Sequence, residues 1–426
     1  MYIPKVFTWA LWPWAPEPQK TSLKPLEFTL RHVHAHTGAR VVFKDVMEHQ
    51  RLSIAETTPE FSTSFTLTPR STKVHRPRSQ QQFFQAQEAS RNRLRKRRRG
   101  ELVEDDEISV AWDEWDVPGP DTGSRDALLV LAKMSWNTYI LPEDPQWYDL
   151  SDWGTTYPFG WEPSDDGLRG HVFVSTDNST VVVSIKGTSA SGVGGGPTVG
   201  KDKLNDNLLF SCCCARVGPT WSPVCGCYGG KYRCDENCVQ EALVEESLFY
   251  PVGTNLYNNI SYIYPEANIW VTGHSLGGAL SGLMGVTFGL PVVTFEAPAE
   301  RMASRRLHLP QPPEIQHITH VFHTADPIPM GTCTGVLSSC AIAGYAMESR
   351  CHLGKKRLYD TVTKYGWSQD VRTHRIGVII DRLLAEDWEE GKPVPDETVD
   401  GSDCDDQECY AWEFGEFLNK SSSSSC

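Results

Sequence analysis

The sequence predicts an α/β fold in which a central, mostly parallel sheet is flanked by helices. The main observation is the stretch "NIWVTGHSLGGALSGLMGV" at residues 268–286, where a short apolar strand, a Gly-rich turn and a small-residue helix follow one another. β-branched runs before this stretch and the run "ITHVFH" after it supply further strands. With 426 residues, of which 39% are apolar, the chain is long enough for one large core and a smaller module.

Charge and cysteine content restrict the class of protein. The chain has 40 basic and 54 acidic residues and a formal net charge of −14, which argues against nucleic acid as a partner. Seven of the 13 cysteines lie between Cys212 and Cys238, a density that predicts disulfides and an oxidising lumen. Glycosylation sequons fit the same compartment. They lie at Asn178, Asn259 and Asn419.

Residues 1–100 are expected to form an N-terminal extension or linker, with a boundary near Gly100. The stretch begins with "MYIPKVFTWALWPWAPEP", whose short apolar run is broken by Pro13 and Pro16. We recognise neither a membrane anchor nor a signal cleavage site there, and we expect a truncated or misassigned start. The longer uncharged run at residues 267–295 is divided by glycines, so we expect a buried strand, helix and strand rather than a membrane span.

Two features of this extension have competing interpretations. In "LRHVHAH", the side chains of His32, His34 and His36 alternate along the chain and would share one face of a strand. We expect a solvated strand face rather than a metal site, because the sequence places no fourth ligand. The basic run Arg91–Arg99 is consistent with a proteolytic processing site, a patch for anionic lipid, or a solvated linker.

The compact domain is expected to begin after this run. "RDALLVLAKMSWNTYI" has apolar residues at helical spacing, with Asp126 near its start, where a carboxylate suits the helix dipole. "GHVFVSTDNSTVVVSIKGTSA" has two β-branched runs joined at Asp177 and Asn178, which predicts a hairpin. A Gly-rich and Cys-rich insertion, residues 190–240, is expected to be a long loop region.

The strand, turn and helix at residues 268–286 contain the pattern G-x-S-x-G, which is typical of the nucleophile elbow of α/β-hydrolases. A nucleophilic Ser275 must sit on a strained turn with its hydroxyl exposed. A side chain at Gly273 or Gly277 would collide with a neighbouring strand or helix. His274 completes the elbow, and the N–H of Leu276 at the helix start would face a developing oxyanion.

A nucleophilic serine needs a base and an orienting carboxylate, which follow it in the order Ser, Asp, His in this fold. "ITHVFHTADPIP" predicts a strand that ends in Asp326, the candidate acid, although a turn-forming Asp before Pro is the alternative. "DVRTHRIGVIIDRLL" places His374, the candidate base, at the mouth of a helix, with His352 as the alternative. The second oxyanion donor is expected at Thr188 in "SIKGTSA", with Ser189 as runner-up.

These motifs together resemble a known family. "GHSLGGAL", "HTADPIP", "DVRTH" and "IKGTSA" resemble the class 3 lipases of the α/β-hydrolase superfamily. "WDVPGPD", "LAKMSWNTY", the Cys-rich "SCCCARVGPTWSPVCGCYGGKYRCDENC" and "FEAPAERMASRRLHLP" are similar to the autophagy-related vacuolar lipases of fungi. The resemblance covers residues 108–415 and implies a lipase domain at 101–418. It implies the following roles: nucleophile Ser275, acid Asp326, base His374, and an oxyanion hole near Thr188.

The resemblance also implies a cellular role. Members of this family are single-pass type II membrane glycoproteins that pass through the Golgi and multivesicular bodies to the vacuole. There they hydrolyse lipids of autophagic and endosomal vesicles, so the expected partners are membrane phospholipids and triacylglycerols. The resemblance implies no metal and no organic cofactor. The expected anchor is not recognisable at this N-terminus, and the end of the chain, residues 419–426, looks like a Ser-rich tail.

The cysteine cluster has two interpretations. Zinc ligation is one, but the paired CxxC spacing of structural zinc sites is absent, so we expect disulfides instead. The cluster lies between the expected oxyanion strand and the nucleophile strand, where lipases of this class carry a lid. We therefore expect the disulfides to brace a cover over the acyl pocket. The candidate zinc ligands are Cys225, Cys227, Cys234 and Cys238.

Two other functions are consistent with the sequence. One is a secreted or lumenal esterase or triacylglycerol lipase without a role in autophagy, which would act on dissolved short esters without preferring aggregated lipid. The other is a non-catalytic lumenal binding protein on a hydrolase scaffold, against which the presence of all three candidate catalytic residue types argues.

Overall fold

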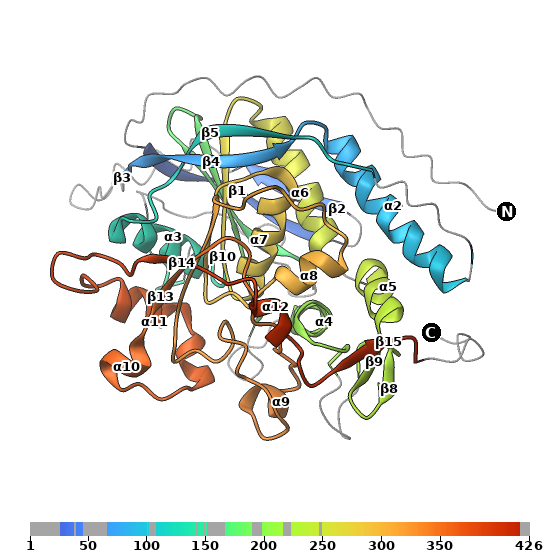
Figure 1. Cartoon of the computed structure of the whole chain (residues 1–426). Helices are drawn as coiled ribbons and strands as arrows, with labels where there is room; N and C mark the ends of the chain where they lie inside the picture. The colour runs from blue at the N-terminus through green and yellow to red at the C-terminus, as the bar shows by residue number, and fades with distance from the viewer. Residues whose placement is uncertain are drawn as a thin grey trace.

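A computed structural model shows a central sheet covered by helices on both faces (Figure 1). The expected α/β fold is confirmed. The part of the chain that the structure describes comprises residues 26–37, 40–45, 66–99, 101, 108–141, 144–148, 150, 167–189, 198–215, 223–246 and 249–417.

The central sheet is mixed, and its middle strands are parallel. β7, β10, β11, β12 and β13 run parallel to one another, whereas β6, β1, β2 and β14 extend the sheet in antiparallel fashion. The order across the sheet is β14 (Glu397–Val399), β13 (Lys355–Tyr359), β12 (Ile318–His323), β11 (Val292–Phe295), β10 (Asn268–His274), β7 (Thr180–Ile185), β6 (Arg169–Ser175), β1 (Leu26–Thr37) and β2 (Arg40–Asp45), with β3 (Thr66–Leu67) paired to β1.

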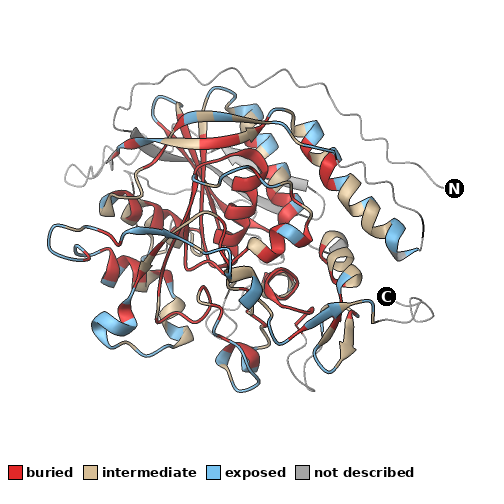
Figure 2. Cartoon of the chain, viewed as in Figure 1, coloured by how far each residue is buried: buried red, intermediate tan, exposed pale blue. Residues whose placement is uncertain are grey.

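Each face of the sheet has its own hydrophobic core, because successive strand side chains point to opposite faces. Val181 and Val183 of β7 belong to one core and Val182 to the other. Figure 2 shows the middle of the sheet in red, and β6, β7, β11 and β12 are buried along their whole length. The helices of the first core include α6 (Phe249–Ile263) and α7 (Leu276–Phe288), and those of the second include α3 (Arg125–Asn137), α11 (Ile376–Val378) and the π-helix η2 (Ile379–Leu383).

Several local predictions are confirmed. The helix expected from Asp126 onward is α3, where Ser124 caps the first turn by accepting a hydrogen bond from the Ala127 amide. The expected hairpin is formed by β6 and β7, and Asn178 at its turn has a φ of 58°. The uncharged run 267–295 forms β10, α7 and β11 as expected. Within the described residues, no helix has the length and apolar character that a membrane crossing requires.

The boundary expected near Gly100 does not coincide with an edge of the fold. β4 (Pro69–Pro77) pairs along its whole length with β5 (Trp112–Pro120), and α2 (Gln80–Arg98) follows β4. Phe83 of α2 is fully buried in the first core, and the Gln87 side chain donates to the Leu307 carbonyl at 2.8 Å. A segment that reads as polar and basic is therefore held by a few long-range contacts that composition does not reveal.

The structure also describes the His-bearing stretch and the basic run of the expected extension. β1 pairs with β6, so "LRHVHAH" forms a strand as expected, inside the central sheet. The basic run after Arg91 is not a linker, because it continues α2, and Arg91 donates to the Leu307 carbonyl at 3.4 Å. The N-terminal residues 1–25, in which no anchor is recognisable from the sequence, lie outside the described residues. The Ser-rich tail 419–426 also lies outside them.

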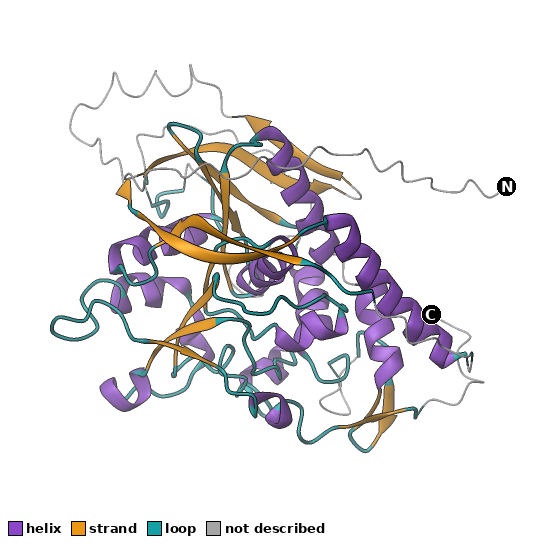
Figure 3. Ribbon diagram, turned by 45° about the horizontal axis from the view of Figure 1, so that its top comes forward, coloured by secondary structure: helices purple, strands orange, loops and turns teal. Residues whose placement is uncertain are grey.

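The cysteine-rich insertion is more ordered than the expected loop. It contains α4 (Val199–Phe210), β8 (Tyr228–Gly230), β9 (Arg233–Asp235) and the start of α5 (Glu236–Glu246), and the C-terminal strand β15 (Glu413–Gly415) pairs with β9. Figure 3 shows the short strands apart from the central sheet. The disulfides are confirmed, and zinc ligation is wrong, because all four candidate ligands are paired. The bridges are Cys212–Cys409, Cys213–Cys234, Cys214–Cys225, Cys227–Cys238, Cys333–Cys340 and Cys351–Cys404.

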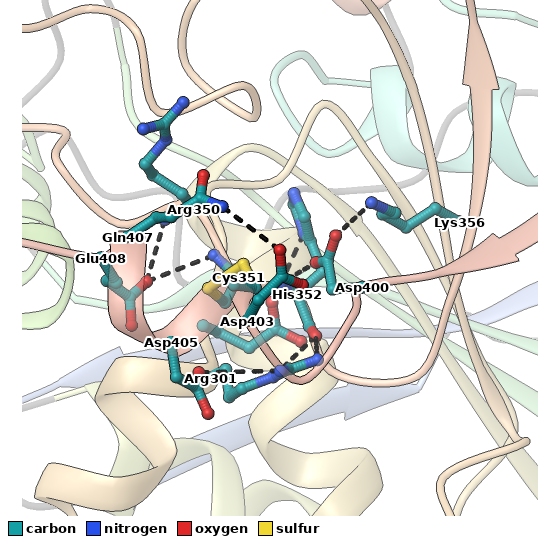
Figure 4. The surroundings of a disulfide bond; sticks show 12 residues. Arg301, Arg350, Cys351, His352, Lys356, Asp400, Asp403, Asp405, Gln407 and Glu408 are labelled. Atoms are coloured by element: carbon teal, nitrogen blue, oxygen red, sulfur yellow. Dashed lines mark hydrogen bonds and ion pairs between the residues drawn. A yellow bond between two sulfur atoms is a disulfide. The ribbon is translucent and has the colours of Figure 1, made fainter.

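The C-terminal segment is fastened to the rest of the chain at several points (Figure 4). Asp400 accepts a hydrogen bond from the His352 amide at 2.7 Å and pairs with Lys356. Glu408 accepts from the Arg350 amide at 2.9 Å. The remaining short elements are α8 (Arg301–Arg306), α9 (Ser339–Ala343), α10 (Thr361–Tyr365), the 3-10 helix η1 (Val371–His374) and α12 (Cys404–Gln407).

Candidate active site

Ser275 lies on the turn between β10 and α7 with φ 55° and ψ −130°. A positive φ is rare for a residue other than glycine and costs free energy, so the surrounding structure must hold it. The Ser275 amide donates to the Phe295 carbonyl of β11 at 3.0 Å, and Ser275 precedes the first residue of α7, Leu276. The strained strand-to-helix turn therefore exists at the expected position.

The two elbow glycines leave no room for a side chain. A Cβ atom at Gly273 would lie 2.6 Å from the Gly277 backbone. A Cβ atom at Gly277 would lie 2.2 Å from the carbonyl oxygen of Ile185 in β7. Contacts this short do not occur in folded proteins, so the collisions predicted from the pattern G-x-S-x-G are present in the fold.

The structure brings together the three residues expected to form a triad. His374 Nε2 lies 2.8 Å from Ser275 Oγ, and His374 Nδ1 lies 2.6 Å from Asp326 Oδ2. The carboxylate of Asp326 is fully buried, while the His374 side chain retains 15% exposure. These contacts assign one tautomer to His374: Nδ1–H donates to Asp326 and Nε2 accepts from the serine hydroxyl. The alternative base His352 instead contacts the Pro329 carbonyl through Nε2, at 3.0 Å.

Backbone contacts fix the acid and the base relative to each other. Asp326 follows β12, and its Oδ1 accepts from the Ile328 amide at 3.0 Å. The Thr373 hydroxyl donates to the Ala325 carbonyl at 3.0 Å, which ties the residue before His374 to the residue before Asp326. Burial alone would raise the pKa of Asp326, but the charge and hydrogen bond of His374, with smaller help from other donors, lower it below its ordinary value.

The elbow histidine has a supporting contact that the sequence did not predict. His274 Nε2–H donates to the backbone carbonyl of His374 at 2.8 Å, and His274 Nδ1 accepts from the Tyr139 hydroxyl at 2.7 Å. Burial lowers the pKa of His274 to about 3, so it is neutral and keeps this donor pattern. His274 and Tyr139 thus hold the loop that carries His374. No local motif marks Tyr139, which lies far from the elbow in the sequence.

The loop after β7, where the second oxyanion donor is expected, lies against the serine. A Cβ atom at Gly187 would lie 3.0 Å from Ser275 Cβ. Gly187, the residue before Thr188, therefore packs directly against the serine. The Thr188 hydroxyl donates to Asp206 Oδ2 of α4 at 2.6 Å. Burial raises the pKa of Asp206 to about 8.

A buried ion pair contacts the same loop and supports it. Lys186 Nζ lies 3.3 Å from Asp202 Oδ2, and both side chains are almost completely buried. Asp202 also accepts from the amide of Ser189, the runner-up donor, at 3.0 Å and from the Thr198 hydroxyl at 2.9 Å. The Ser189 amide is thereby engaged, which leaves Thr188 as the better candidate. Sequence reasoning missed both aspartates, because it treated their helix as loop.

Clusters that could offer metal ligands occur in the described part of the chain, and each of them includes ligand atoms that already have protein partners. In the buried cluster of Glu300, His320 and His352, His320 Nε2 donates to the Leu353 carbonyl at 2.7 Å. His320 Nδ1 lies 2.8 Å from the hydroxyl of Thr294. Two further clusters contain disulfide-bonded cysteines, and the fourth includes Asp326 and His374.

The three sequons differ in their surroundings. Asn178 is exposed on the turn of the β6–β7 hairpin. Asn259 is exposed on α6, where its side-chain amide donates to the Asn255 carbonyl at 2.9 Å. Asn419 lies outside the described residues.

A mixed sheet with parallel middle strands, a strained serine elbow, and Asp and His following the serine in that order place the fold among the α/β-hydrolases. Residues 248–334 match the model of a family described as Lipase (class 3). The match lies across β10, α7, β11 and β12, which carry the serine elbow and Asp326.

Named relatives match a large part of the chain. The chain is 57% identical over 302 residues to a protein of Cryptococcus neoformans named "Putative lipase ATG15", covering 69% of this chain and 58% of the relative. It is 52% identical over 290 residues to the protein of the same name in Mycosarcoma maydis, covering 66% and 55%. Among solved structures, a Rhizomucor miehei lipase propeptide complex is 16% identical with a TM-score of 0.31, covering 57% of this chain and 70% of that chain. The chain thus spans less than two thirds of the length of these two relatives.

Proposed function

We propose that this protein is a serine lipase and phospholipase that hydrolyses acyl ester bonds of membrane phospholipids and triacylglycerols. The observation that carries the proposal is the continuous hydrogen-bonded chain from Ser275 Oγ through His374 to Asp326, at 2.8 and 2.6 Å. Such a chain activates a serine hydroxyl for nucleophilic attack. The match to the family model described as Lipase (class 3) supports the choice of carboxylic esters as substrates.

The proposed reaction is acyl transfer in two steps. His374 Nε2 takes the proton from Ser275 while the serine oxygen attacks the ester carbonyl carbon. The N–H groups of Leu276 and Thr188 stabilise the negative oxygen of the tetrahedral intermediate. His374 then gives the proton to the leaving alcohol, which leaves an acyl-serine. Water, activated by His374, attacks the acyl-serine and releases the fatty acid.

An exposed apolar loop supports aggregated lipid as the substrate form. After Asp326 the chain forms a loop closed by Cys333–Cys340, and this loop exposes Val336 and Leu337 by 59% and 87%. Ile342 on the adjacent α9 is 77% exposed. Large apolar side chains at such exposure favour contact with a lipid surface. The loop follows Asp326 along the chain, so it begins at the edge of the sheet where the acid lies.

The cellular role is proposed from the relatives. The name ATG15 carried by proteins at 57% and 52% identity supports lysis of autophagic bodies and multivesicular-body vesicles in the vacuole. Delivery through the Golgi as a glycosylated, membrane-anchored protein belongs to the same proposal. Six disulfides and exposed sequons at Asn178 and Asn259 support an oxidising lumen.

The test is fatty-acid release from phosphatidylserine or phosphatidylethanolamine liposomes, beside a triacylglycerol emulsion and a dissolved short-chain ester. We expect wild-type protein to hydrolyse the aggregated lipids and Ser275→Ala to lose at least about 1,000-fold in kcat. The control is Thr254→Ala, on α6, whose hydroxyl donates to the Pro251 carbonyl of the same helix. Equal release by wild type and Ser275→Ala would refute the assignment. Activity confined to the short ester would favour a soluble esterase, and inactivity of folded protein would favour a binding protein.

A further inference from the structure

A second buried carboxyl group lies beside the candidate triad. Glu296 is the first residue after β11, and its side chain is fully buried. A carboxyl oxygen of Glu296, one of Asp326 and a ring nitrogen of His374 all lie within 4.8 Å of one another. The reaction proposed above uses Asp326 and His374 but gives Glu296 no task.

The backbone of Glu296 is also held in an unfavourable conformation. Its φ is 46°, in the left-handed region that suits glycine. Its amide donates to the Val321 carbonyl of β12 at 3.0 Å, which fixes the peptide against the strand that leads to Asp326. A glycine at this position would adopt the same backbone without strain, so the carboxyl side chain needs a separate reason.

The surrounding charges decide the protonation state of Glu296. In the described part of the chain, the titratable groups that face it are Asp326, His374 and His323, with His274 beyond His374. His323 Nε2 lies 3.6 Å from Glu296 Oε1 but donates to the Thr373 carbonyl at 3.2 Å. Burial lowers the pKa of His323, so it is not a permanent cation.

Two carboxylates this close cannot both be ionised in a buried site without a cation between them. Burial, followed by the charge of Asp326, raises the pKa of Glu296 well above its ordinary value, and the opposing effect of the His323 amide is smaller. Asp326 has several donors for its ionised form, namely His374 and the Ile328 amide. The proton therefore resides on Glu296, and Asp326 carries the charge.

We propose that Glu296 is a positioning residue that, in its protonated form, donates a hydrogen bond to Asp326 and so sets the pH range over which His374 acts as a base. The proposal rests on the serine-lipase function proposed above. Glu296 keeps its proton throughout the reaction and touches no substrate. The proposed bond extends to Glu296 the observed chain of hydrogen bonds from Ser275 through His374 to Asp326.

The direction of the effect follows from the charge on Asp326. A further donor to Asp326 draws negative charge away from the oxygen that accepts from His374 Nδ1–H. The imidazolium form of His374 is then less stabilised, so the base stays neutral at a lower pH. When Glu296 loses its proton at high pH, a second negative charge faces Asp326 and the arrangement is disturbed. The carboxyl of Glu296 thus extends activity on the acid side and limits it on the alkaline side.

The experiment measures kcat/KM against pH with a dissolved short-chain ester, for wild type and two variants of matched shape. Glu296→Gln keeps an N–H donor toward Asp326 and cannot ionise, whereas Glu296→Met has similar length and no donor. We expect Glu296→Gln to keep the acid limb of wild type and to lose its alkaline limb. We expect Glu296→Met to move the acid limb upward by about one pH unit.

A third variant and a second readout keep the proposal testable. Glu296→Gly also lacks the donor but removes the strained side chain, so it replaces Glu296→Met if that variant does not fold. The low-field proton resonance of His374 Nδ1–H should be close to wild type in Glu296→Gln and displaced in either non-donor variant. Acid limbs that coincide in all variants, or a Gln variant that shifts as far as the non-donor variants, would overturn the proposal. Absence of hydrolysis by wild type would instead count against the proposed function.

Discussion

Removing the disulfide Cys212–Cys409 should destabilise the protein far more than removing Cys333–Cys340. In each case both cysteines are replaced by alanine. A cross-link restricts the unfolded chain by an amount that grows with the logarithm of the loop it closes. The sequence separations are 197 and 7 residues, which correspond to about 5 and about 2 kcal/mol respectively. The Cys351–Cys404 bridge shortens the long loop by 53 residues, which lowers the larger figure by only about 0.3 kcal/mol.

The assay is equilibrium unfolding in urea, monitored by tryptophan fluorescence, for wild type and the two double variants. The matched control is the short bridge itself, because Cys212, Cys333 and Cys340 are all buried and lose the same atoms on replacement. We expect the free energies of unfolding of the two variants to differ by about 3 kcal/mol, with a steeper denaturant slope for the variant that lacks Cys212–Cys409, because its unfolded chain is more open. Equal losses, or a larger loss for the short bridge, would refute the chain-entropy reasoning for this fold.

The remaining predictions concern the support of the site and the pH dependence of stability. Tyr139→Phe removes the hydroxyl that donates to His274 Nδ1 and should lower kcat by about 3- to 10-fold with KM unchanged, which steady-state kinetics on a short ester would show. His171 is buried and its pKa is lowered from 6.5 to about 4, so only the unfolded chain takes up its proton between these values. Stability should therefore fall as pH drops from 6.5 to about 4, by up to about 3 kcal/mol from this group. His171→Gln, which keeps a donor for the Asn137 carbonyl, should flatten that fall in urea unfolding at pH 7 and pH 4.5.

The sequence predicted those parts of the fold that depend on neighbours along the chain. The elbow at Ser275 was readable because strand, turn and helix are contiguous and because both flanking glycines are sterically required. Asp326 and His374 could be chosen because their order after the serine is fixed in this fold. The β6–β7 hairpin and α3 followed from alternating and helical apolar spacing.

Contacts between distant segments could not be predicted. The sequence around Glu296 gives no sign that its carboxyl group lies beside Asp326, which only the pairing of β11 with β12 brings near. Tyr139 reaches His274 across 135 residues. The helix α2 was missed because its hydrophobic contacts are few and its exposed face is strongly basic. The helix α4 was missed because it follows a Gly-rich stretch and precedes three consecutive cysteines.

The pairing of these three consecutive cysteines has a consequence for how the chain matures during its synthesis. The partners of Cys213 and Cys214 lie 21 and 11 residues further on and emerge from the ribosome almost at once. The partner of Cys212 is 197 residues away, a delay of roughly 10 to 40 s at ordinary translation rates. During that interval Cys212 is a free thiol beside two newly formed bridges, where thiol–disulfide exchange can scramble them. Correct maturation therefore needs a compartment that can reopen wrong pairings as well as form new ones, because the last link closes only after the whole central sheet has been made.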